Sequence, residues 1–140
     1  MLKSEIIFKK ILLLFILFLP ILIRAQVHIG FTEAEIKKLH SDKTFETGFT
    51  DYGAKYTASF MHYGTFFYWF DKQNRRSIFC TQVIEHIPYL NAQVEVYNKK
   101  YVILSDTEWK AYLEDGEILN IRLKYDESIK KYVFYYTLKQ

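Results

Sequence analysis

Apolar and polar residues alternate regularly over the last part of the chain. Between residues 119 and 125 the apolar positions are every second residue, namely Leu119, Ile121, Leu123 and Tyr125. A polar turn at residues 126–131 precedes a second alternating row, namely Tyr132, Phe134, Tyr136 and Leu138. A period of two is typical of a strand with one buried face. The pattern predicts a β-hairpin whose outer face carries Val133, Tyr135 and Thr137.

Three apolar stretches in the middle of the chain predict three more antiparallel strands. They are KYTASFMHY, TFFYWFD and SIFCTQVIE, joined by a turn at Gly64 and by the polar stretch DKQNRR. Before them, the segment SDKTFETGFTDYG is rich in turn-forming residues. It predicts a loop in which Gly48 and Gly53 adopt positive φ angles.

Two segments begin with the same helix-capping pattern. Thr32 and Glu35 have the spacing of a capping box, in which each side chain accepts a hydrogen bond from the backbone amide of the other residue. Ser105 and Glu108 repeat this spacing. The pattern predicts a short helix after each cap.

A further helix is predicted at residues 87–100, where apolar residues recur at helical spacing behind Pro88. Residues 101–104, YVIL, predict a short strand before the Ser105 cap. The predicted order is therefore α-βββ-α-β-α-ββ. This is an α+β fold, with a single antiparallel sheet of five to six strands packed against two or three short helices.

An uncharged apolar run near the N-terminus extends only from Ile11 to Ile23, whereas a membrane-spanning helix needs about 17–25 residues. Lysines precede the run and the small residue Ala25 follows it, which is the arrangement of a secretory signal peptide. We therefore expect a cleaved signal peptide at residues 1–25 and a single α+β domain at 26–140, exported to the periplasm or the cell exterior. The alternative is an uncleaved N-terminal membrane anchor, because the residues just before Ala25 are not ideal for cleavage.

The charge balance argues against one class of partner, and the cysteine content predicts a core residue. The sequence has 19 Lys and Arg against 16 Asp and Glu. Residues 1–26 hold four of the basic residues and one acidic residue, which leaves 15 of each in the remaining chain. A domain without surplus positive charge has little to neutralise phosphates, so nucleic acid is not an expected partner. The single cysteine, Cys80, lies in an apolar stretch and is predicted to be a buried core residue.

The run Phe66 to Phe70 is the most conspicuous apolar feature, because it places five aromatic rings on one predicted strand. One interpretation is a central strand buried on both faces. The other is an aromatic binding surface, to which the sequence assigns Tyr68, Trp69 and Phe70 together with His62 and Tyr135. The chain has 12 Tyr and 12 Phe, more rings than one small core needs. Tyrosine is also favoured at interfaces.

The histidines show no spacing typical of a metal site, and there is no pair of cysteines, so neither a metal nor a cofactor is expected. His62 lies on a predicted strand and Glu85 at the end of another. These two side chains would form an acid–base pair if strand pairing brought them together. The sequence contains no nucleophile elbow or phosphate-binding glycine loop.

The abundance of Lys, Ile, Phe and Tyr, and the segment ILIRAQ, resemble small exported proteins of the Bacteroidota group. In its order of a helix followed by antiparallel strands, the chain is similar to compact envelope folds of the beta-lactamase inhibitor protein and outer-membrane assembly lipoprotein type. The resemblance is one of architecture, since the chain has no cysteine at the end of the apolar run, where a lipoprotein carries its lipid.

Three functions are compatible with these features. The favoured one is an exported, non-catalytic binding protein that docks a protein or a hydrophobic ligand on an aromatic sheet face. The alternatives are a small cofactor-free hydrolase using His62 and a carboxylate, and a structural subunit of an envelope assembly. The last of these predicts self-association into a homo-oligomer.

Overall fold

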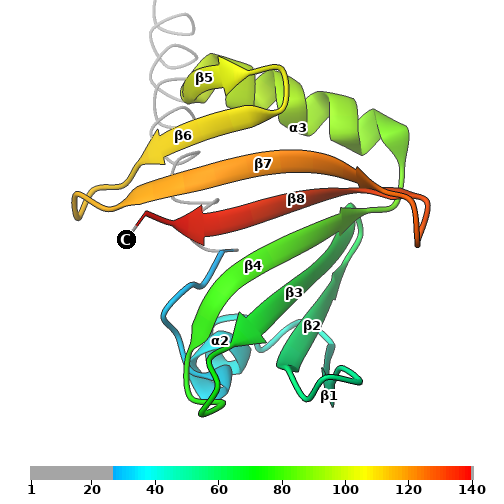
Figure 1. Cartoon of the computed structure of the whole chain (residues 1–140), viewed down its shortest axis with the longest axis vertical. Helices are drawn as coiled ribbons and strands as arrows, with labels where there is room; N and C mark the ends of the chain where they lie inside the picture. The colour runs from blue at the N-terminus through cyan, green and yellow to red at the C-terminus, as the bar shows by residue number, and fades with distance from the viewer. Residues whose placement is uncertain (1–26, 140) are drawn as a thin grey trace, which may run out of the picture.

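Rows of alternating apolar side chains build most of the fold. The computed structural model describes residues 27–139. In chain order these residues form α2 (Glu33–Leu39), β1 (Phe45–Phe49), β2 (Lys55–Met61), β3 (Gly64–Phe70), β4 (Ser77–Ile84), α3 (Ile87–Lys100), β5 (Val102–Ser105), β6 (Glu108–Tyr112), β7 (Ile118–Asp126) and β8 (Lys131–Leu138), as Figure 1 shows.

The eight strands of the described residues form one antiparallel sheet in the order β1-β2-β3-β4-β8-β7-β6-β5. The first four strands make one meander and the last four make another. The two meet where β4 pairs with β8, with Cys80 opposite Tyr136 and Val83 opposite Val133. Figure 1 shows β1 and β5 at the two ends of the sheet, and the strand direction turns between them as the usual sheet twist requires.

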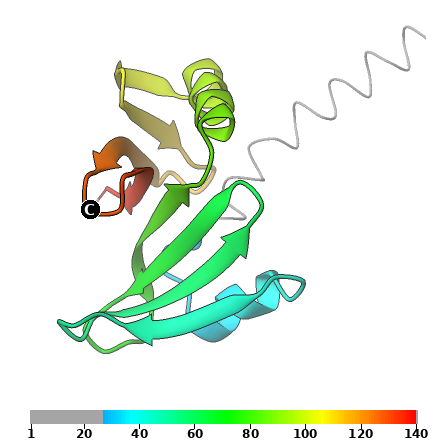
Figure 2. The same cartoon turned by 90° about the vertical axis from the view of Figure 1, so that its right-hand side faces the viewer.

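The two faces of the sheet differ because both helices pack on the same one. We call this the closed face, and the opposite one the open face. Figure 2 shows α3 beside the strands of the second meander and α2 beside those of the first. The closed face carries one continuous core made by the sheet and both helices, whose buried members include Ile36, Tyr68, Cys80, Leu90, Tyr97, Trp109, Phe134 and Tyr136.

A buried hydrogen-bond network fastens α3 to the closed face. Gln93 of α3 and Gln82 of β4 exchange two amide hydrogen bonds of 2.7 and 3.1 Å. Gln93 Nε2 also donates to the Tyr97 hydroxyl, and the Tyr136 hydroxyl donates to Gln82 Oε1. Because Gln82 and Tyr136 are almost completely buried, these bonds offset the cost of removing their polar groups from water.

The first helix, α2, begins with the predicted capping box. Thr32 Oγ1 accepts a hydrogen bond from the Glu35 amide, and the Glu35 carboxylate accepts one from the Thr32 amide. Glu33 attaches the helix to the sheet, since its carboxylate accepts a hydrogen bond of 2.6 Å from Thr47 of β1 and pairs with Lys55 of β2 at 2.5 Å. The prediction of this helix is therefore confirmed.

The predicted fold class is wrong in its number of strands and in its order of elements, which included a third helix at Ser105. Residues 27–139 form an eight-stranded sheet with two helices in the order α-ββββ-α-ββββ. Ser105 begins no helix, because residues 102–112 form the β5–β6 hairpin. The Ser105 hydroxyl accepts a bond from the Thr107 amide, so a cap-type side chain here closes a turn. Pairing of β6 with β7 places Trp109 and Ala111, which are two residues apart, on the closed face, where both are buried.

The predicted loop at residues 41–53 also contains a strand, β1, at the edge of the sheet. Gly48 lies within this strand, and the described residues with positive φ include Gly53 at +79° but not Gly48. Gly48 serves a different purpose, because a Cβ atom there would lie 2.6 Å from the Tyr56 hydroxyl oxygen. Glycine at this position lets the Tyr56 ring lie against the edge strand.

The three predicted central strands, the helix at 87–100 and the final hairpin are confirmed. The predicted signal peptide at residues 1–25 lies outside the described residues. Between residues 27 and 139, none of the helices has the length and apolar character needed to cross a membrane.

Candidate functional site

Strand β3 divides the aromatic run between the two faces of the sheet. Phe66, Tyr68 and Phe70 point to the closed face, where they are 1%, 0% and 5% exposed. Phe67 and Trp69 point to the open face and are half-buried. Tyr68 and Phe70 were predicted to bind a ligand, but they belong to the core, because successive residues of a strand point in opposite directions. Burial also raises the pKa of the Tyr68 hydroxyl.

Four aromatic rings gather on the open face of β2, β3 and β4. The ring centroids of Trp69 and Phe79 are 5.7 Å apart with nearly parallel planes, and those of Phe67 and Trp69 are 6.2 Å apart. Tyr56 packs against both Phe67 and Trp69. The indole nitrogen of Trp69 donates a 3.0 Å hydrogen bond to Thr81 Oγ1. This bond fixes the indole, so the cluster offers a preformed apolar surface.

An apolar hollow of about 400 Å³ lies beside these rings, and we call it the aromatic hollow. It is lined by Phe67, Trp69, Phe79, Thr81, Val83, Asp126, Ile129, Val133 and Tyr135. Thr81 and Val133 are buried, whereas Ile129, in the turn between β7 and β8, is 47% exposed. The hollow therefore has a sheet floor and a side that is open to solvent.

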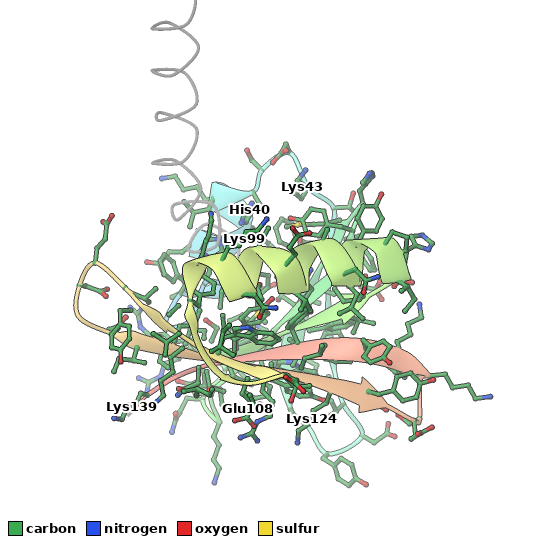
Figure 3. All side chains as sticks on the ribbon, turned by 90° about the horizontal axis from the view of Figure 1, so that it is seen from above. His40, Lys43, Lys99, Glu108, Lys124 and Lys139 are labelled. Atoms are coloured by element: carbon green, nitrogen blue, oxygen red, sulfur yellow. The ribbon has the colours of Figure 1, made fainter. Side chains whose placement is uncertain are left out.

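A second, more polar hollow of about 480 Å³ adjoins the first, and Tyr135 lines both. Its charged residues on the open face are Glu108, Arg122 and Lys124. Arg122 Nε pairs with Glu108 Oε1 at 2.8 Å, and Lys124 Nζ lies 5.9 Å from the centroid of the Tyr135 ring. Figure 3 shows Glu108 and Lys124 on the side of the sheet opposite α3. We call this region the charged end of the open face.

The carboxylate of Asp126, which lines the aromatic hollow, accepts hydrogen bonds from within the protein. Asp126 accepts hydrogen bonds from both the hydroxyl and the backbone amide of Ser128. The bond from the Ser128 hydroxyl, followed by that from its amide, lowers the pKa of Asp126. Asp126 is therefore ionised at neutral pH and places a negative charge at the edge of the aromatic hollow that lies nearer to the β7–β8 turn.

The structure gives the predicted pair His62 and Glu85 different neighbours. His62 is exposed in the turn between β2 and β3, with its ring 5.7 Å from that of Tyr89. The Glu85 carboxylate bonds to the ammonium group of Lys131. Neither His62 nor Glu85 lines the two hollows of the open face. Of the five predicted binding residues, only Trp69 and Tyr135 come together there.

Four further residues of the site, Phe79, Val83, Val133 and Ile129, are not identified by the sequence pattern. The first three share one face with Trp69 because Trp69 pairs with Phe79, and Val83 pairs with Val133. Alternation along each strand shows that their side chains share a face within that strand. It does not reveal that β4 pairs with β8, so the site depends on a contact between segments far apart in the sequence.

The histidines and the single cysteine are the remaining candidates for metal binding or reactivity. His28 and His40 lie with their Nε2 atoms 2.6 Å apart, a contact that the sequence did not suggest. Among residues 27–139 no cluster of three or more His, Cys, Asp or Glu has the arrangement of a metal site.

Cys80 is completely buried, as predicted, and burial raises the pKa of its thiol. The thiol therefore stays in the unreactive protonated form.

Comparisons of the chain with models of protein families, with curated proteins and with solved structures give no match.

Proposed function

We propose that the protein is an exported, non-catalytic binding protein whose open face holds the apolar part of a ligand in the aromatic hollow. The observation that supports this proposal is the aromatic hollow itself. Its volume of about 400 Å³ falls within the range of about 300–1,000 Å³ that is usual for ligand sites. Export is supported by the N-terminal apolar run with its flanking lysines and small residue.

The arrangement of the rings supports binding over a purely structural role. Aromatic rings that serve only the core are covered, as Tyr68 and Trp109 are on the closed face. Phe67, Trp69 and Phe79 remain half-exposed beside a concavity. Burying this surface against an apolar group is favourable by about 25 cal/mol per Å², and the rings are already stacked, so little side-chain entropy is lost on binding.

Octanol is a suitable first probe because it has an apolar chain and no charge. Titration calorimetry of the protein produced from the whole sequence should show saturable octanol binding. The substitution Ile129→Asn removes an apolar wall of the hollow at an exposed turn position, so the fold should be retained. We expect this variant to bind octanol about fivefold more weakly. A fivefold change corresponds to the loss of roughly 1 kcal/mol of binding free energy from apolar contact.

A matched control is Leu39→Asn, which changes another exposed aliphatic residue, at the end of α2. This variant should bind octanol as the unaltered protein does. The proposal is wrong if octanol does not bind saturably, or if the two variants lose the same affinity.

A further inference from the structure

The two hollows of the open face form a site with an apolar part and a charged part. Tyr135 of β8 lines both. On the apolar side, Val133 and Trp69 line the aromatic hollow. On the other side, Arg122 pairs across the strands with Tyr135, and Lys124 pairs with Val133. The side chains of Arg122 and Lys124 therefore lie directly beside residues that line the aromatic hollow.

Positive charge at the charged end is only partly neutralised within the protein. Glu108 pairs with Arg122 through Nε, and this ion pair is exposed. Among the ion pairs found within residues 27–139, none involves Lys124. Lys124 is exposed, and its ammonium group lies over the face of the Tyr135 ring, 5.9 Å from the centroid. An ammonium group in this position is free to pair with an anion on a ligand.

The other end of the aromatic hollow disfavours an anion. Asp126 lies there, two residues beyond Lys124 on the same face of β7. Its carboxylate is engaged by Ser128 and would repel a second negative charge. The charge distribution along β7 thus gives a bound chain a direction, with the negative group toward Lys124 and the apolar body toward Ile129.

We propose that the ligand is an anionic amphiphile, whose apolar body fills the aromatic hollow and whose negative head lies beside Lys124 and Arg122. This inference rests on the proposed function and names the chemical class of its ligand. Opposite charge at the surface adds little binding energy per pair, so the apolar contact supplies most of the affinity and the cations supply the preference for an anion.

Octanoate and octanol test this proposal because they share a chain length and differ in charge at neutral pH. In low-salt buffer we expect octanoate to bind more tightly than octanol, by about threefold. The variant Lys124→Gln should remove most of this preference and leave octanol binding unchanged. The matched variant Lys99→Gln alters a lysine on α3, on the opposite side of the sheet in Figure 3, and should leave both affinities unchanged.

Each outcome has a definite meaning. If both ligands bind but with equal affinity, the anionic head is wrong and the proposed function stands. If octanoate is preferred and Lys124→Gln keeps that preference, the assignment of the head to Lys124 is wrong. If neither ligand binds, the proposed function fails and this inference fails with it. A preference that falls with added salt and disappears in Lys124→Gln supports the proposal.

Discussion

The closed and open faces are built by the same strands and hold the same kinds of side chain, but their aromatic side chains differ in how far they are covered. On the closed face, Trp109 is completely buried and its indole nitrogen donates to Asn98 of α3. On the open face, Trp69 is half-buried and its indole nitrogen donates to Thr81 within the sheet. The closed-face rings therefore depend on a helix, whereas the open-face rings hold one another in place and leave a hollow beside them. Coverage by a helix, and not composition, therefore decides which aromatic side chains of this sheet are accessible to a ligand.

The largest expected difference between the faces concerns stability. Tyr68→Ala removes a fully buried ring from the closed face and should lower the free energy of unfolding by about 3–5 kcal/mol. Phe67→Ala removes the neighbouring ring from the open face, where it is half-exposed, and should cost about 1–2 kcal/mol. Urea denaturation of both variants measures this. Equal costs would mean that the open face is covered in solution.

Two adjacent residues of β4 give a smaller contrast in hydrogen bonding. Gln82→Leu leaves the polar groups of Gln93 and Tyr136 short of a buried partner, so it should lower the free energy of unfolding by about 2 kcal/mol. Thr81→Val removes only the acceptor for the Trp69 indole, and should cost about 1 kcal/mol. Thermal unfolding compares the two costs. The Trp69 fluorescence should change in the Thr81 variant and not in the Gln82 variant.

A pH dependence is also expected, from the attachment of α2 to the sheet. Partial burial alone would raise the pKa of Glu33, but hydrogen bonds from Lys37, Lys55 and Thr47 lower it from the ordinary 4.5 to about 2. A lowered folded-state pKa contributes stability above the unfolded-state pKa, and this stability is lost as the pH falls toward 2.

The variant Glu33→Gln should therefore lose stability at neutral pH and show a weaker decline in stability between about pH 5 and pH 2. Denaturation midpoints across this range are the measurement. Glu46→Gln, at an exposed position on β1, is the control and should retain the decline. An unchanged decline in the Glu33 variant would show that this attachment does not act in solution.

A sequence pattern predicted an element correctly where the local pattern agrees with the way that element packs in the fold. The final hairpin has both alternation and a polar turn, and α3 has both helical spacing and an initial proline, so both were predicted. Thr32 and Ser105 carry the same capping pattern but differ in outcome. Thr32 precedes a helix that buries Ile36, whereas Ser105 precedes Trp109 and Ala111, which are buried on the closed face of β6 with a period of two.

The site could be predicted only in part for a related reason. Trp69 and Tyr135 were identified from their aromatic character, and both lie on the open face. Tyr68 and Phe70 share the aromatic run with Trp69, but adjacent residues of a strand point in opposite directions, so these two rings lie on the closed face. Phe79 and Val83 join Trp69 through the neighbouring strand β4. Val133 and Ile129 join the site only because β4 pairs with β8, whose partners are some 50 residues apart in the sequence, and no local pattern encodes that pairing.

The two tryptophans, one on each face, can report in a single sample whether the open face binds a ligand. A proton–nitrogen NMR spectrum of the labelled protein resolves the two indole signals, which Trp69→Phe assigns. On addition of octanol, we predict that the Trp69 signal shifts in a saturable manner while the Trp109 signal stays in place. If Trp109 shifts as much as Trp69, or if neither signal moves, the open face is not the binding surface.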